Sequence, residues 1–174
     1  MFWLKLISKF IKILRAGESP SAIAGGITIG FLIGLTPFWS LQNVLLLILA
    51  ILTTVNLASV FFSLFLFSFT AYLFDPWFHD LGYFILVKVD FLQTLWTTLY
   101  NMPLAPFTRF YNTVVMGSTL SALVLAPIIY LLSLKGVIIY RNKWADRIQN
   151  HKIIKYLKST TIVQWYIKLR DLRW

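Results

Sequence analysis

Long apolar stretches, broken by short polar or proline-containing groups, dominate this chain. Two stretches carry no charged residue, namely residues 19–74 and 110–134. A helix needs about 20 apolar residues to cross about 30 Å of hydrocarbon, so residues 110–134 suffice for one crossing. Residues 19–74 have room for more than two crossings, but polar breaks at Thr36-Pro37 and at 53–56 divide them. The expected apolar helices in this region are 20–35, 41–52 and 57–74.

The first two of these helices are short for a membrane span. They have 16 and 12 residues, and at 1.5 Å per residue they would be about 24 and 18 Å long. Ser19-Pro20 is typical of a helix start, with a serine N-cap and a first-turn proline. Residues 20–52 therefore predict either a proline-broken re-entrant hairpin or two short spans, and we favour the hairpin. The expected fold is an all-α polytopic membrane protein with two full transmembrane helices, 57–74 and 110–134.

The segment 75–109 is apolar but contains Lys88, Asp90 and three prolines. A crossing over 81–99 would place Lys88 and Asp90 in mid-membrane, which is energetically costly. We therefore expect this segment to lie along the outer interface of the bilayer.

Composition and charge agree with a membrane protein. Apolar residues make up 59% of the 174 residues and charged residues only 13%, about half the usual charged share of a soluble domain. The net charge of +10 divides into +3 over residues 1–19, −1 over 20–134 and +8 over 135–174. This asymmetry predicts that both termini are cytoplasmic.

Both ends also have an amphipathic pattern. Residues 1–18 are expected to form a basic interfacial helix, and residues 135–174 a basic cytoplasmic tail, both lying on anionic phospholipid. A basic tail with interleaved aromatics could also bind nucleic acid, but its position directly after a span favours the membrane surface. Trp39 places the Pro37 turn near a bilayer boundary or in a polar pocket, because tryptophan prefers the headgroup region.

Small residues recur at every fourth position near the start of the membrane domain. They are Ala22, Gly26, Gly30 and Gly34. Such a ridge allows a second helix to approach closely where lipid offers no hydrophobic driving force. The ridge predicts internal packing, against 41–52 or 110–134, or else a docking groove for a partner helix or a lipid chain.

Polar side chains follow the Pro37 break. Ser40, Gln42 and Asn43 stand at the start of the second short helix. The exposed N–H groups and positive dipole end of a broken helix could receive a lipid phosphate. Alternatively, Ser40 is an N-cap while Gln42 and Asn43 tie helices together. Asn56 is open to the same two interpretations.

Asp75-Pro76 is typical of a helix start, with aspartate as the cap and proline in the first turn. Asp75 and His79 are four residues apart and could also share a metal or a proton relay, but a third ligand is not evident. The chain has no cysteine. We find no paired carboxylates, nucleophile elbow, phosphate-binding loop or zinc-binding HExxH motif, and we expect neither catalysis nor a cofactor.

The stretch from Pro20 to Asn56 resembles a bacterial membrane family known only as a domain of unknown function. The positions that carry the resemblance are Pro20, Ala24, Gly26, Gly30, Gly34, Pro37, Gln42 and Asn56. The run from Asp75 to Gly82 resembles the version found in one subfamily of these proteins, which occurs in bacteria with outer membranes. The resemblance implies that the signature residues Asp75, Pro76, His79 and Gly82 have a structural role. Members of that subfamily are often encoded beside AsmA-like proteins, a class associated with lipid movement between envelope membranes.

The resemblance implies a non-enzymatic protein of the bacterial inner membrane that partners an AsmA-like protein in phospholipid transport to the outer membrane. The alternative is a stand-alone small transporter or lipid translocase, which could form a homo-oligomer. The candidate lipid or partner contacts are Ala22, Gly26, Gly30, Gly34, Pro37, Trp39, Ser40, Gln42, Asn43 and Asn56.

Overall fold

The computed structural model describes residues 18–144, and the described chain is entirely helical. Its principal helices are α2 (Pro20–Leu35), α3 (Leu41–Leu52), α4 (Leu57–Tyr83), α5 (Gln93–Tyr100) and α6 (Thr113–Ile139). Short irregular helices follow α4, precede and follow α5, and follow α6; they are η1 (Phe84–Lys88), η2 (Asp90–Leu92), η3 (Ala105–Thr108) and η4 (Tyr140–Trp144). The all-α prediction is confirmed.

The chain forms two units, residues 1–137 and 138–174. The described part of the second unit is the end of α6 and the π-helical turn η4. The expected amphipathic helix over 1–18 and most of the basic tail over 135–174 lie outside the described residues.

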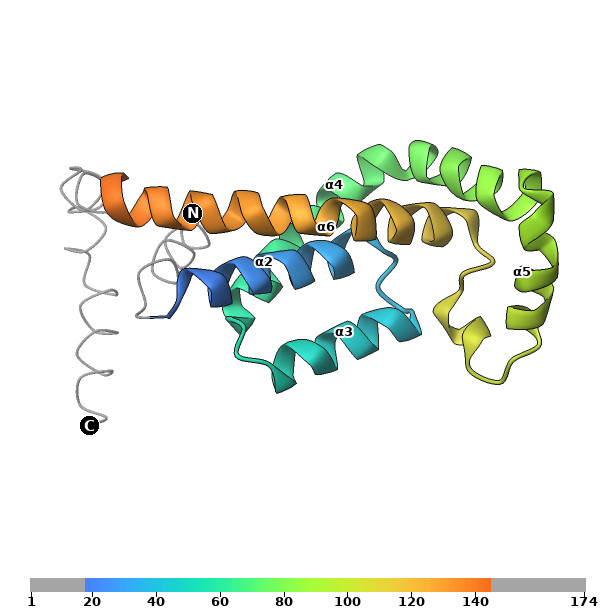
Figure 1. The fold of residues 1–174 in the computed structure, drawn as a ribbon, viewed down its shortest axis with the longest axis horizontal. Helices are drawn as coiled ribbons and strands as arrows, with labels where there is room; N and C mark the ends of the chain where they lie inside the picture. Colours follow the sequence, from blue (N-terminus) through green and yellow to red (C-terminus); the bar gives the residue numbers. More distant parts are fainter. Residues whose placement is uncertain (1–17, 145–174) are drawn as a thin grey trace. The chain divides into compact units, whose positions relative to one another are not determined.

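The two short helices begin and end at the residues that the sequence predicted. The hydroxyl of Ser19 accepts a hydrogen bond from the Ala22 N–H (3.1 Å), which confirms the predicted N-cap of α2. Helix α3 runs back beside α2, so the two form a hairpin around the turn at Thr36–Ser40 (Figure 1). Ile33 of α2, Ala50 of α3 and Val60 of α4 form one buried apolar cluster.

Helices α2 and α4 are parallel and in close contact. Successive glycines of α2 meet successive turns of α4: Gly26 lies against Ser59, Gly30 against Ser63, and Gly34 against Phe67. The Ser63 hydroxyl also donates a hydrogen bond to the carbonyl of Ile27 (2.7 Å). The hairpin therefore lies alongside the first half of α4.

Helix α6 packs against the second half of α4 in the opposite direction. Gly82 of α4 contacts the carbonyl of Thr113, and Gly117 of α6 contacts the carbonyl of Phe78. A second apolar cluster joins Phe31, Leu35, Phe78 and Ala122 from α2, α4 and α6. Helix α4 is therefore packed against α2 over one half of its length and against α6 over the other.

Two helical stretches are long and apolar enough to cross a bilayer, Leu57–Lys88 and Thr113–Asn142. In their most apolar 18-residue windows only 17% and 11% of the residues are buried, whereas the core helix of a soluble protein is mostly buried. Large apolar side chains such as Leu73 (77% exposed) and Val124 (71%) face outward. These helices suggest a membrane location.

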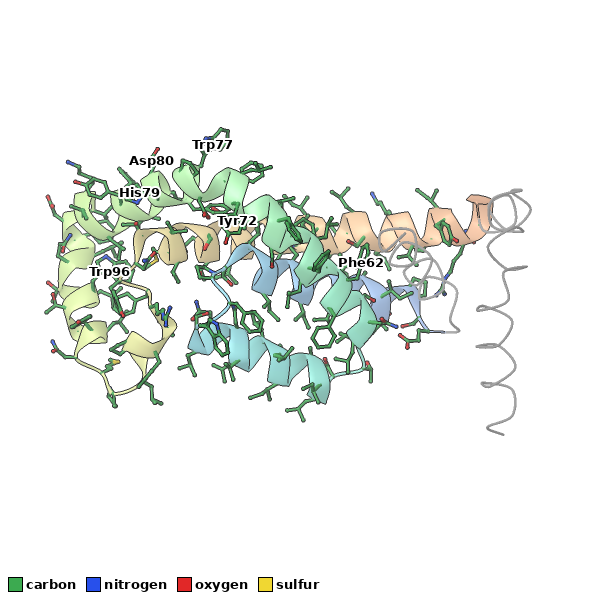
Figure 2. All side chains as sticks on the ribbon, turned by 180° about the vertical axis from the view of Figure 1, so that it is seen from behind. Phe62, Tyr72, Trp77, His79, Asp80 and Trp96 are labelled. Carbon is green, nitrogen blue, oxygen red and sulfur yellow. The ribbon has the colours of Figure 1, made fainter. Side chains whose placement is uncertain are left out.

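The segment between α4 and α6 is not a third long helix. It contains η1, η2, the eight-residue helix α5 and η3. The Trp96 indole N–H donates to the carbonyl of Ile85 (3.2 Å), and its ring lies 6.0 Å from that of Phe110. Figure 2 shows Trp96 pointing from α5 toward the chain that returns to α6. The short α5 is too short for a crossing, which agrees with an interfacial segment.

Candidate functional site at the hairpin turn

The turn between α2 and α3 is held by the side chain of Asn43, which is 3% exposed. Its Oδ1 accepts from the Thr36 hydroxyl (2.8 Å), and its Nδ2 donates to the carbonyls of Pro37 (3.0 Å) and Phe38 (3.4 Å). These bonds satisfy backbone carbonyls that the proline break leaves without helical partners. Asn43 thus has the tying role that was one of its two predicted roles.

Ser40 stands at the N-cap position of α3, but its side chain makes no capping bond. Its hydroxyl donates to the carbonyl of Pro37 instead (3.2 Å). Ser40 therefore has the N-cap position that was one of its two predicted roles, but it caps α3 through its backbone carbonyl and not through its side chain. The reason is local: the tight turn brings the Pro37 carbonyl within reach of the hydroxyl, which bonds there rather than to the first turn of α3.

Two aromatic side chains at the turn face outward. Phe38 is 52% exposed and Trp39 is 76% exposed, and their rings form an edge-to-face pair with centroids 5.4 Å apart. No pocket of the described chain therefore encloses Trp39. Pro37 beside them is exposed as well.

A cavity of about 460 Å³ lies next to the turn, between α2, α3 and α6. Leu32, Thr36, Gln42, Asn43, Leu45, Leu46, Leu49, Thr119, Ala122 and Leu123 line it. Its volume is in the range of small-molecule sites, and its wall has the usual character of such sites, mostly apolar with a few polar groups. None of the lining residues is charged.

The glycine ridge of α2 is not a free groove. Gly26, Gly30 and Gly34 are buried against α4, and a side chain at Gly30 would overlap the Val60 carbonyl. Internal packing was one of the two predicted uses of the ridge. The predicted packing partners, 41–52 and 110–134, were wrong for these glycines, because the glycines meet α4, where the small side chains of Ser59 and Ser63 allow the two backbones to approach closely.

Asn56 joins the start of α2 to the start of α4. Its backbone N–H donates to the Ala22 carbonyl (3.0 Å), and its Oδ1 accepts from the backbone and side chain of Ser59 (2.7 and 2.8 Å). Its Nδ2 donates to the Glu18 carboxylate. Asn56 is thus the N-cap of α4 and a bridge between helices, and Ala22 contributes through its carbonyl.

Asp75-Pro76 does not begin a helix, so that prediction was wrong. Helix α4 continues through Pro76 to Tyr83. Proline inside a helix removes one backbone bond, and membrane helices tolerate this loss when neighbouring groups support the backbone. The contacts of Gly82 and Phe78 with α6 hold this part of α4 in place.

His79 hydrogen-bonds through Nδ1 to the hydroxyl of Thr113 at the start of α6 (2.7 Å) and stacks on the Tyr83 ring. Figure 2 shows it on the second half of α4, with Trp77 and Asp80 pointing away from the helices. Among residues 18–144, no group of three or more His, Asp or Glu side chains could hold a metal ion. His79 and Gly82 both belong to the contact between α4 and α6.

The sequence analysis did not single out Thr119, which lines the cavity, or Gly117, which forms the close contact with Phe78. The cluster of small and polar residues in Gly117-Ser118-Thr119, near the start of an otherwise apolar stretch, is the signal that could have indicated a buried helix contact there.

Comparison with known proteins identifies the family of the chain. The model of a family described as "Uncharacterized protein conserved in bacteria (DUF2062)" matches residues 5–145. The chain belongs to this family. The matched DUF2062 region contains the hairpin, the cavity and both long helices.

A relative described as "Uncharacterized protein", from Treponema pallidum (strain Nichols), is 27% identical over 159 residues. The alignment covers 91% of this chain and 98% of the relative. No solved structure matches the chain. The predicted resemblance to a bacterial family of unknown function is thereby confirmed at the level of the DUF2062 family.

Proposed function

We propose that this DUF2062 protein is a non-enzymatic protein of the bacterial inner membrane that acts as the membrane partner of an AsmA-like protein in phospholipid transport. The AsmA-like partner comes from the resemblance of residues Asp75 to Gly82. The structural observation that carries the proposal is the hairpin of two helices too short to span a bilayer, with an exposed aromatic turn between them. This turn offers a preformed contact surface within the membrane domain.

The register between α2 and α4 supports a re-entrant hairpin. Both helices begin at the same end, where Asn56 bonds to Ala22, and the last glycine of α2 lies beside Phe67, ten residues into α4. Ten residues of helix correspond to about 15 Å, half of the hydrocarbon thickness. In this arrangement α2 enters the membrane, turns at Thr36–Ser40 inside it, and α3 returns to the side of entry.

The side of entry follows from charge. The basic ends of the chain favour the cytoplasmic face, so the hairpin opens to the cytoplasm, α4 runs outward and α6 runs back. Residues 84–112 then lie at the outer face, and both termini are cytoplasmic.

The proposed partner contact is the aromatic pair Phe38 and Trp39. The glycine ridge is occupied by α4, which leaves the turn and the outward face of α3 as the exposed parts of the hairpin, and of these the turn carries the aromatic pair. Tryptophan side chains are enriched among residues that dominate binding energy at interfaces. A turn inside the membrane also needs a covering protein surface, because irregular backbone is not stable against lipid tails.

Co-purification from native membranes tests the proposal. The tagged full-length chain, expressed at its natural level, is expected to recover the AsmA-like protein of the same organism, identified by mass spectrometry. Trp39→Ala should reduce this recovery about 30-fold, the effect of a loss of roughly 2 kcal/mol. Tyr72→Ala is the matched control, because Tyr72 is a similarly exposed aromatic residue (79%) that belongs to α4 and not to the turn.

Failure to recover the AsmA-like protein with the wild-type chain would contradict the partnership. Equal recovery with Trp39→Ala and Tyr72→Ala would instead show that the turn is not the contact.

A stand-alone lipid translocase or small transporter is the second candidate, and the cavity beside the turn favours it. Movement of fluorescent phospholipid between leaflets of liposomes that contain only the purified chain is its test. Activity at the level of protein-free liposomes would exclude this alternative.

A further inference from the structure

Two residues in the wall of the cavity beside the hairpin turn each carry a buried polar atom that has no partner among residues 18–144. Gln42 Oε1 and Thr119 Oγ1 are buried, and neither has a hydrogen-bond partner. Both residues line the cavity, one from α3 and the other from α6. The other polar residues of the wall, Thr36 and Asn43, bond to each other. A buried polar atom without a partner is destabilising, so a ligand that hydrogen-bonds to these two side chains would stabilise the folded chain.

The chemistry of the wall limits that ligand. A glutamine amide offers both an acceptor and donors, and a threonine hydroxyl both donates and accepts. A hydroxyl group of the ligand can donate to the glutamine oxygen and can also accept from the threonine hydroxyl, whereas an ester or ether oxygen can only accept. No lining residue carries a charge, so a phosphate here would be a buried anion without a counter-charge, which is strongly unfavourable.

The rest of the wall matches a hydrocarbon chain. Leu45 (57% exposed), Leu49 (48%) and Leu123 (56%) lie at its rim and belong to the outward faces of α3 and α6. In a membrane these faces meet lipid tails, so the cavity opens to the hydrocarbon region and receives molecules dissolved there.

We propose that this cavity binds an uncharged lipid alcohol of the diacylglycerol class. The free hydroxyl lies between Gln42 and Thr119, and an acyl chain follows Leu45, Leu49 and Leu123. The proposal rests on the membrane location of the long helices and does not depend on the AsmA-like partner.

Thermal unfolding of the purified full-length chain, delipidated in detergent, tests the site. A ligand that binds only the folded state raises the unfolding temperature. Dioleoylglycerol at about 100 times its dissociation constant should raise Tm by roughly 5–10 °C. Dioleoylphosphatidylglycerol, which has the same chains on a charged headgroup, should leave Tm unchanged.

Two sets of variants separate binding from folding. Gln42→Met with Thr119→Val removes both unpartnered atoms, so Tm without lipid should be equal or higher, while the shift with dioleoylglycerol disappears. Leu123→Phe narrows the cavity and should also abolish the shift. Val124→Phe is its matched control, because Val124 is exposed and does not line the cavity, and it should keep the shift.

The proposal is overturned if dioleoylglycerol leaves the wild-type Tm unchanged, or if the phosphatidylglycerol produces an equal shift. It is also overturned if the double variant keeps the full shift. None of these outcomes affects recovery of the AsmA-like protein, and loss of that recovery would leave the lipid-induced shift intact.

Discussion

At Gly30 the backbones of α2 and α4 are so close that a Cβ atom would overlap the Val60 carbonyl and crowd Ser63. The fourfold spacing of small residues was visible in the sequence and identified a contact face. It did not identify what covers that face, because spacing describes one helix only. The covering surface depends on Ser59 and Ser63, whose small side chains are unremarkable in an aromatic-rich stretch.

Gly30→Leu should therefore destabilise the protein by about 3 kcal/mol or more, the upper end of overpacking effects, because the obstructing atoms belong to backbone. Gly136→Ala is the control, since a Cβ there meets open space, and alanine in mid-helix should stabilise by about 0.5–1 kcal/mol. Equilibrium unfolding in detergent measures both. Equal stability of Gly30→Leu and wild type would contradict the close contact.

At the scale of elements, the sequence predicted α2 and α3 at their observed bounds and underestimated α4. The pair Ser19-Pro20 marks the start of α2 and the pair Thr36-Pro37 marks its end, and both pairs are recognisable in the sequence. Asp75-Pro76 has the same local signal but lies within α4. The difference is tertiary, because Phe78 and Gly82 pack against Gly117 and Thr113 and so hold the helix beyond the proline.

The path of the hairpin is testable with single cysteines, since the chain has none. In a re-entrant hairpin, Thr54→Cys should react with a membrane-impermeant maleimide from the cytoplasmic side and Asp80→Cys from the outer side. Phe38→Cys should then react slowly from both sides. All three residues are exposed on the protein, so differences in labelling report on the membrane. Rapid outer labelling of Phe38→Cys would show two short spans instead.

At the scale of the whole chain, apolar side chains cover much of the surface of residues 18–144. Most of the basic residues lie in the sequence before and after these residues. We therefore expect two modes of membrane attachment. Burial of the long helices in hydrocarbon does not depend on salt, whereas attraction of basic segments to anionic lipid is screened by salt.

We therefore expect the full-length chain to stay in the membrane pellet after washing with 1 M salt or alkaline carbonate, and to be released only by detergent. Fractionation followed by immunoblotting measures this, with a peripheral membrane protein as the control that is released. Extraction of the chain by carbonate would contradict insertion of α4 and α6.

The sequence by itself determined the helical fold class, the apolar amino-acid composition typical of a membrane protein, the bounds of the two short helices and the proline break between them. These properties depend on local composition and on helix-ending residues, which are readable along the chain. Only the tertiary structure decided that α4 covers the glycine ridge, that Asn43 closes the turn, and that Gln42 meets Thr119 across a cavity. The glycine contact and the cavity depend on residues far apart in sequence, the Asn43 bonds depend on the path of the turn, and the apolar helices present many faces of nearly equal hydrophobicity. Packing geometry, rather than pattern, selects among such faces.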